Sequence, residues 1–237
     1  MSVLIVRSVP LSKAVRESWR SAGAKFLKRN AHQDKLNKLA AKADAVLNLG
    51  NLEFDFDELD APVFNYPGDV RAISHPSALR RNLGDFIPPH PEKGDWYWVK
   101  RGGFGGLGTE LYTNWPGTKD PAEIRFGDIQ KHVEGEEFRV ITVGDVVVQA
   151  TRKLNPRWVN GKHQFDFEWV GVEGIKSNGI IPLLKKAINS MEWDGCTVIG
   201  WDVIVGPEGA FILEGNFSPG VNEATASRIV EQMRRSL

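Results

Sequence analysis

Apolar residues in the first third of the chain form short runs that are separated by segments with helical spacing. The runs lie at residues 3–7, 45–50 and 62–66. Between the first two runs, Val15 and Trp19 share one face of a candidate helix, which Ser12 precedes as an N-cap and Gly23 follows. Strands that alternate with helices predict a small parallel sheet in the N-terminal part.

Beyond a proline-rich connector at residues 88–91, the pattern changes to the period-two alternation of strands. Such alternation occupies residues 96–100, 138–150 and 165–170, and a Gly-Asp turn divides the second of these into two strands. Arg139 then lies near the start of one strand and Arg152 beyond the end of its partner, and residues 157–161 interrupt the regularity. Helical spacing predicts helices at residues 77–83, 177–193 and 222–235.

The stretch from residue 198 to 220 predicts a final hairpin with a three-residue loop at 207–209. If Gly206 faces Ala210 across that loop, counting outward places Asp202 opposite Glu214.

Asn216 then projects from the same face as these two carboxylates. Two carboxylates in apolar surroundings repel each other unless a cation lies between them. Carboxylate and amide oxygens suit Mg²⁺, which usually binds together with a substrate phosphate. Taken alone, the hairpin is equally compatible with a solvated strand face.

A glycine-rich segment follows the strand at residues 96–100. Five of the seven residues at 102–108 are glycine, which lets backbone N–H groups approach phosphate oxygens, and Lys100 adds a point charge at the strand end. The spacing differs from the GxxxxGK[ST] loop. A surface hairpin is the alternative reading of the same glycines.

Composition narrows the choice of partner. Lys plus Arg and Asp plus Glu number 30 each, so no excess of positive charge indicates nucleic acid or an acidic membrane surface. The single Cys196 cannot form an internal disulfide, and the apolar run at residues 1–7 is too short for a signal peptide or a membrane span. We therefore expect a cytoplasmic protein with a small-molecule or peptide substrate.

In this order, the motifs resemble the ATP-grasp superfamily, and within it the ligases similar to the ribosomal-protein glutamate ligase. The resemblance covers roughly residues 63–230. GWDVI at 200–204 and ILEGNFSPG at 212–220 look like the two metal-binding strands of that family. VKRGGFGGLG at 99–108 looks like its lysine strand and glycine-rich lid, and residues 130–153 look like its adenine hinge and arginine-bearing strands.

The resemblance implies an α+β protein with the ATP-grasp fold, in which ATP and Mg²⁺ lie between two α+β subdomains that follow a small N-terminal α/β domain with a parallel sheet. The divisions would be 1–88, 89–133 for the lid subdomain, and 134–237. The implied site residues are Lys100 for the α and β phosphates, Gly102, Gly103, Gly105 and Gly106 for the lid, Gln130, His132 and Val133 for adenine, Glu136 or Glu137 for ribose, Asp202, Glu214 and Asn216 for magnesium, and Arg139 and Arg152 for an acyl phosphate.

The implied function is an ATP-dependent carboxylate–amine ligase that forms an acyl phosphate and releases ADP and phosphate. Its substrates would be a carboxylate and an amine acceptor, each a small molecule or a peptide, and related ligases often form homodimers. One departure concerns a second phosphate-binding lysine, which residues 74–81 lack and which Arg71, Arg80 or Arg81 would have to replace. A kinase for a small hydroxyl substrate, with a basic pocket from Arg80, Arg81 and Arg157, and a nucleotide-binding module without turnover are the alternatives.

Overall fold

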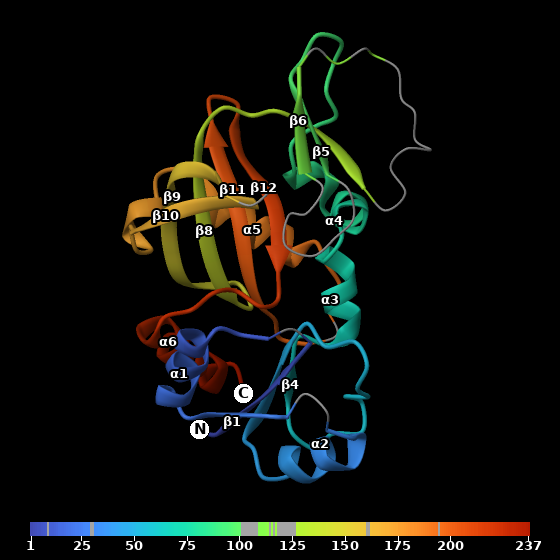
Figure 1. Cartoon of the computed structure of the whole chain (residues 1–237), viewed down its shortest axis with the longest axis vertical. Coiled ribbons are helices and arrows are strands. Elements are labelled where there is room, and N and C mark those ends of the chain that lie inside the picture. Colours follow the sequence, from blue (N-terminus) through green and yellow to red (C-terminus); the bar gives the residue numbers. More distant parts are fainter. Residues whose placement is uncertain are drawn as a thin grey trace.

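The computed structural model describes the whole chain except residues 9, 29–30, 101–108, 114, 116, 118–126, 160–161 and 194. Its strands form three sheets (Figure 1). The predicted glycine-rich lid, with Gly102, Gly103, Gly105 and Gly106, lies outside the described residues.

The N-terminal sheet is parallel, as the alternation of strands and helices predicted. Its strands are β1 (Val3–Arg7), β2 (Ala24–Phe26), β3 (Ala45–Leu49) and β4 (Val63–Phe64), in the order β2-β1-β3-β4. Helices α1 (Lys13–Ser21) and α2 (Gln33–Ala40) connect the first three strands. The Ser12 side chain accepts a hydrogen bond of 3.3 Å from the Val15 amide, which confirms the predicted N-cap.

A second sheet carries the strand that was predicted to hold the phosphate-binding lysine. It has the order β6-β5-β7, with β5 (Tyr97–Lys100), β6 (Thr109–Tyr112) and β7 (Asp128–Lys131) all antiparallel. We call this sheet the lid sheet. In Figure 1 it lies next to the upper end of β11 and β12, two strands of the five-stranded sheet that is described below.

The third sheet is antiparallel and has five strands in the order β10-β9-β8-β11-β12. These strands are β8 (Glu136–Val143), β9 (Val146–Val159), β10 (Lys162–Trp169), β11 (Val198–Gly206) and β12 (Gly209–Asn216). One face packs on α3 (Pro67–Ile73), α4 (Pro76–Leu83) and α5 (Ile180–Asn189) through buried residues that include Trp201 and Val203. Short 3₁₀ turns follow α4 at Gly84–Phe86 and precede α5 at Glu173–Ile175.

One end of the opposite face of the five-stranded sheet is covered by other parts of the chain. There Val143 and Val198 share a buried cluster with β1, β3 and the last helix, α6 (Glu223–Arg235). Figure 1 shows α6 beside α1, at the junction of the N-terminal sheet with the five-stranded sheet. The division at residues 88 and 133 stays a prediction, and buried clusters contain residues from both sides of it.

The predicted bounds of one strand and one helix were wrong. β9 does not end at Ala150 but runs to Val159, because its pairing with β10 extends it. Asn155 takes a left-handed conformation (φ 51°) where the register of that pairing shifts, and the strand continues beyond this irregularity. Helix α5 begins at Ile180 and not at residue 177, because Gly179 has a φ of 80°, and it ends at Asn189 and not at residue 193.

A buried amide network joins the N-terminal sheet to β11. Asn65 is fully buried with a φ of 64°, and its Nδ2 donates to the carbonyls of Asn48 (3.0 Å) and Val198 (3.1 Å). Its Oδ1 accepts from the Val198 amide at 2.6 Å. The network satisfies the backbone at the start of β11, the strand that carries the first predicted metal ligand.

Candidate functional site

The predicted opposition of the two carboxylates is confirmed, although the turn that sets it differs. Asp202 of β11 pairs with Glu214 of β12, but Gly206 faces Gly209 instead of Ala210. A bulge at Leu213, between the pairs Val203–Ile212 and Asp202–Glu214, adds the residue that the shorter turn removes. The two deviations cancel, and both carboxylates lie on the face of the sheet opposite α5.

Gly200 makes room for the third predicted metal ligand. Asn216 lies opposite Gly200 and donates from Nδ2 to the Gly200 carbonyl at 3.1 Å, which leaves its amide oxygen as an acceptor. A Cβ on Gly200 would lie 2.8 Å from Pro219 and 3.2 Å from Asn216 Nδ2. The GxD pattern is therefore explained by close packing.

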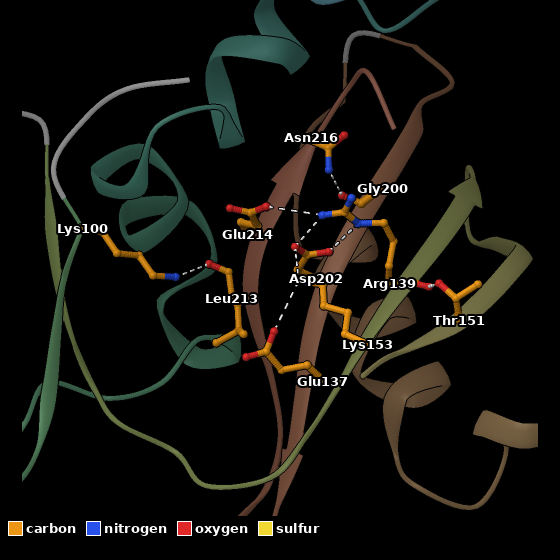
Figure 2. A network of polar contacts seen from close by, with 10 residues as sticks. All are labelled: Lys100, Glu137, Arg139, Thr151, Lys153, Gly200, Asp202, Leu213, Glu214 and Asn216. Carbon is orange, nitrogen blue, oxygen red and sulfur yellow. Dashed lines mark hydrogen bonds and ion pairs between the residues drawn. The ribbon is translucent and has the colours of Figure 1, made fainter. Parts of the chain in front are cut away.

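Asp202 is buried and held by two cations (Figure 2). Arg139 donates to its two oxygens at 2.7 Å each, and Lys153 Nζ donates to one of them at 2.6 Å. Burial alone would raise the pKa of Asp202, but Lys153 and then Arg139 outweigh it and hold the pKa well below its usual range.

Glu214 has the opposite electrostatic environment. Its side chain is 49% accessible, and its nearest described ion-pair partner is Arg139, at 3.7 Å. Partial burial, followed by the charge of Asp202, raises the pKa of Glu214 to about 7. The negative charge of Asp202 is thus compensated by close cations, whereas that of Glu214 is compensated less. Glu214 is also the more accessible of the two carboxylates, so a metal ion could reach it from solvent.

Lys100 reaches this carboxylate pair from the lid sheet. Its Nζ donates to the Leu213 carbonyl at 2.8 Å (Figure 2). Burial lowers the pKa of Lys100, and the charge of Glu214 opposes that shift. The structure thus brings Lys100, Asp202, Glu214, Asn216 and Arg139 together, as predicted.

The structure does not bring Arg152 to the carboxylates. Arg139 pairs with Thr151 across β8 and β9, so the next residue, Arg152, points to the other face. There it forms ion pairs with Glu136 (2.7 Å) and Glu168. Glu136 shares that face, whereas Glu137 lies on the face of the carboxylates.

Lys153 is the functional residue that the sequence reasoning missed. Its side chain is 5% accessible and bridges Asp202 and Glu137, the latter at 3.3 Å. Because β9 was expected to end at Ala150, strand alternation was not extended to residue 153. The sequence contained a signal for this residue. Arg152 and Lys153 are consecutive, and in a strand only one of two consecutive side chains can face the carboxylates.

Two of the predicted adenine residues, His132 and Val133, lie on the connection from the lid sheet to β8, and the third, Gln130, lies in the lid sheet. Gln130 is buried in β7, and Trp98 Nε1 donates to His132 Nδ1 at 3.0 Å. His132 and Val133 line an open cavity of about 310 Å³ with Trp96, Glu134, Pro207 and Glu208. This cavity lies at the β11–β12 turn, and its lining includes neither carboxylate.

The connection is packed backbone against backbone. A Cβ on Gly135 would lie 2.2 Å from the Val205 carbonyl oxygen, so any larger residue there would push β8 away from β11. The position of the lid sheet relative to the carboxylates depends on this close approach.

Two of the arginines that the kinase alternative would need for a basic pocket, Arg80 and Arg157, form ion pairs in different parts of the described structure. Arg80 donates to Asp128 and to the carbonyls of Pro88 and Ile129, and Arg157 pairs with Asp166 at 2.6 Å. Arg80 therefore binds the lid sheet, while Arg157 lies on the β9–β10 hairpin.

The oxygen ligands of the site fit magnesium. Two carboxylates and an amide oxygen are the hard donors that Mg²⁺ prefers, with phosphate oxygens completing its shell. Among the described residues, no group of three or more His, Cys, Asp or Glu side chains is placed to hold a metal ion, so Asn216 and the substrate would have to contribute. No helix in the described part of the chain is long and apolar enough to cross a membrane.

Comparison with known proteins supports the same fold. No protein-family model and no curated protein sequence matches the chain. Among solved structures, D-alanine–D-alanine ligase from Bacillus anthracis superposes with a TM-score of 0.62 at 13% identity, covering 99% of this chain and 96% of that one. N5-carboxyaminoimidazole synthetase from Staphylococcus aureus, complexed with ADP, gives 0.65 at 13% identity, with coverage of 97% and 76%.

The ATP-grasp ligase PsnB, complexed with a minimal precursor, gives a TM-score of 0.61 at 15% identity and covers 99% of both chains. These structures share the architecture of this chain over nearly its whole length. The chain therefore has the ATP-grasp fold, as its motifs predicted.

Proposed function

We propose that this protein is an ATP-dependent ligase that joins a carboxylate to an amine and releases ADP and phosphate. The observation that carries the proposal is the pairing of Asp202 with Glu214, with Arg139 and Lys153 beside them and Lys100 facing them from the lid sheet. Two of the similar structures are described as ligases, and a third contains ADP.

In this proposal the protein side chains bind, orient and neutralise charge. Asp202, Glu214 and Asn216 would hold Mg²⁺, which offsets negative charge on the phosphoryl group being transferred. Lys100 would move from the Leu213 carbonyl to a phosphate oxygen, because its ammonium group forms a stronger hydrogen bond with an anionic oxygen than with a neutral one.

Arg139 and Lys153 would stabilise the second half of the reaction. The substrate carboxylate takes the γ-phosphoryl group to form an acyl phosphate, and the amine attacks its carbonyl carbon, expelling phosphate and losing a proton. Negative charge develops on the carbonyl oxygen in that attack, next to where the two cations already converge. No protein nucleophile takes part, so Cys196 has no role in the reaction.

The test is a coupled assay with pairs of carboxylates and amines, drawn from amino acids, short peptides and a small-molecule extract. We expect release of ADP and phosphate that requires both substrates, with a product whose mass equals their condensation. Release of AMP and pyrophosphate would contradict the proposed chemistry, and a phosphorylated product without condensation would indicate the kinase alternative. A cytoplasmic location and a homodimer stay untested predictions.

A further inference from the structure

Two large aromatic side chains are half exposed on β10, the edge strand of the five-stranded sheet. Phe167 is 52% exposed and Trp169 is 46% exposed. Glu168 between them points to the other face, where it forms an ion pair with Arg152. The strand thus presents aromatic residues on one face and acidic residues on the other. Large apolar side chains gathered on one exposed face are typical of a surface that binds another molecule.

The register of the sheet places Trp169 on the face of the carboxylates. Trp169 lies opposite Thr151 on β9, and Thr151 lies opposite Arg139 on β8. Arg139 lies opposite Asp202, which lies opposite Glu214. One row of paired residues therefore crosses all five strands, and paired residues point to the same face. Because neighbouring strands lie about 4.8 Å apart, Trp169 is about 10 Å from Arg139 along this row.

Phe167 lies beside the cations of the site. It pairs with Lys153 across β9 and β10 and shares the face of Trp169, which is two residues further along the strand. The centroid of its ring is 5.8 Å from the guanidinium carbon of Arg139. Arg139 and Lys153 are the two cations that bind Asp202, so the exposed aromatic surface begins directly beside the charged part of the site.

The cations beside both rings indicate the charge of the molecule that this surface would bind. The guanidinium of Arg228, on α6, lies 4.7 Å from the ring centroid of Trp169, as Arg139 lies beside Phe167. Among the residues that the structure describes, Arg228 has no carboxylate partner. A ligand with a negative charge and an apolar ring complements both the cations and the aromatic side chains.

We propose that Phe167 and Trp169 are specificity-determining residues that select a carboxylate substrate with an apolar ring in its side chain. This inference rests on the proposed ligase function and names the class of one of its two substrates. The carboxylate would bind beside Arg139, and the ring would stack on Phe167 and extend toward Trp169. A carboxylate without such a ring would leave both aromatic side chains in water.

The test compares two carboxylates that differ by one ring, 3-phenylpropionate and propionate. Their dissociation constants are measured by NMR titration of the whole chain in the presence of ADP and Mg²⁺. We expect 3-phenylpropionate to bind tighter by about tenfold or more, since an aromatic ring that leaves water for an apolar surface gains about that factor.

Serine in place of either aromatic residue should narrow this preference. In Phe167→Ser and in Trp169→Ser we expect the ratio of the two dissociation constants to fall by about threefold or more, and in the double variant to approach one. The Kd for ADP should stay at the wild-type value. Glu168→Gln is the matched control, because it lies between the two rings and points to the other face, and it should keep the wild-type ratio.

The outcomes separate this inference from the proposed function. A wild-type ratio near one overturns the inference without any variant, and so does a ratio that both folded serine variants keep or that Glu168→Gln lowers equally. If the serine variants keep the ratio but turn a dimer into a monomer in sedimentation, the surface is a contact between two copies of the chain, which also overturns the inference. In all these cases binding of ADP leaves the proposed nucleotide site intact. If the wild-type chain does not bind ADP, the proposed function fails and the inference fails with it.

Discussion

Lys100 of the lid sheet and Leu213 of the five-stranded sheet are joined by a hydrogen bond of 2.8 Å from Nζ to the carbonyl oxygen. The carbonyl is available because Leu213 is the extra residue of the bulge in β12. The same bulge that restores the register of Asp202 and Glu214 thus also provides the acceptor for the lid lysine.

Replacing Lys100 with Met should weaken nucleotide binding while leaving the fold intact. The variant loses a donor to phosphate but removes a charge whose burial is unfavourable. We expect the Kd for ADP to rise by about tenfold or more, measured by calorimetry. Lys131→Met, on the other face of the lid sheet, is the control. Equal affinities in the two variants would contradict the role of Lys100.

Glu214→Gln should abolish ligase activity without destabilising the protein. The side chain is 49% accessible and is repelled by Asp202, so the neutral amide is tolerated in the fold but is a poorer magnesium ligand. We expect a fall in kcat of about 100-fold or more and an unchanged or higher midpoint of urea unfolding. An active, folded Glu214→Gln enzyme would remove Glu214 from the metal site. Glu173→Gln, at an exposed position before α5, serves as the control.

Lys153 and Arg152 offer a matched pair of neighbouring cations on opposite faces of β9. Lys153→Met should lower activity by about 100-fold and stability by about 2–4 kcal/mol, because the buried Asp202 loses one of its two cationic partners. Arg152→Met should change stability by less than about 1 kcal/mol, since its ion pairs are partly exposed to solvent. Denaturant unfolding and steady-state rates measure both. A larger loss of activity in Arg152→Met would reverse the assignment.

The raised pKa of Glu214 predicts a dependence of stability on pH in the protein without Mg²⁺. Its folded-state pKa is about 7, above the value of about 4.3 in an unfolded chain. The folded state therefore binds the proton more tightly, and this contribution is complete below about pH 4 and is lost as pH rises through 7.

Solvent screening at a half-exposed side chain limits the effect to about 1 kcal/mol. Urea midpoints measured from pH 5 to pH 8 should fall relative to those of Glu214→Gln, which has no proton to lose at this position. Parallel curves for the two proteins would show that Glu214 ionises normally.

Asn65→Ala should be strongly destabilising because its amide satisfies buried backbone groups of two sheets. Loss of the bonds to Asn48 and Val198 should lower the free energy of unfolding by about 3 kcal/mol. Asn155→Ala is the control, since Asn155 also has a positive φ but is exposed, and should cost about 1 kcal/mol. Similar losses in the two variants would mean that backbone strain, and not the network, dominates.

The sequence predicted the site where short-range pattern and chemistry agreed, and failed where distant contacts decided. Asp202 and Glu214 were paired correctly because two errors of one residue cancelled: the turn is shorter than expected and Leu213 bulges. Neither could be read from local residue preferences, because a bulge depends on what packs against the strand, here the lid lysine. The length of β9 failed for the same reason, since its pairing with β10 carries it beyond Ala150.

The packing of α6 on α1 and the first strands has a consequence for how the chain folds. The last helix, 13 residues long, fills the same buried cluster as Val3 and Ile5. Contacts between the two ends of the sequence close the longest loop available and form late. During synthesis the N-terminal sheet must therefore keep an apolar surface uncovered until α6 has been made, and a ribosome-bound fragment that lacks α6 is exposed to aggregation through that surface.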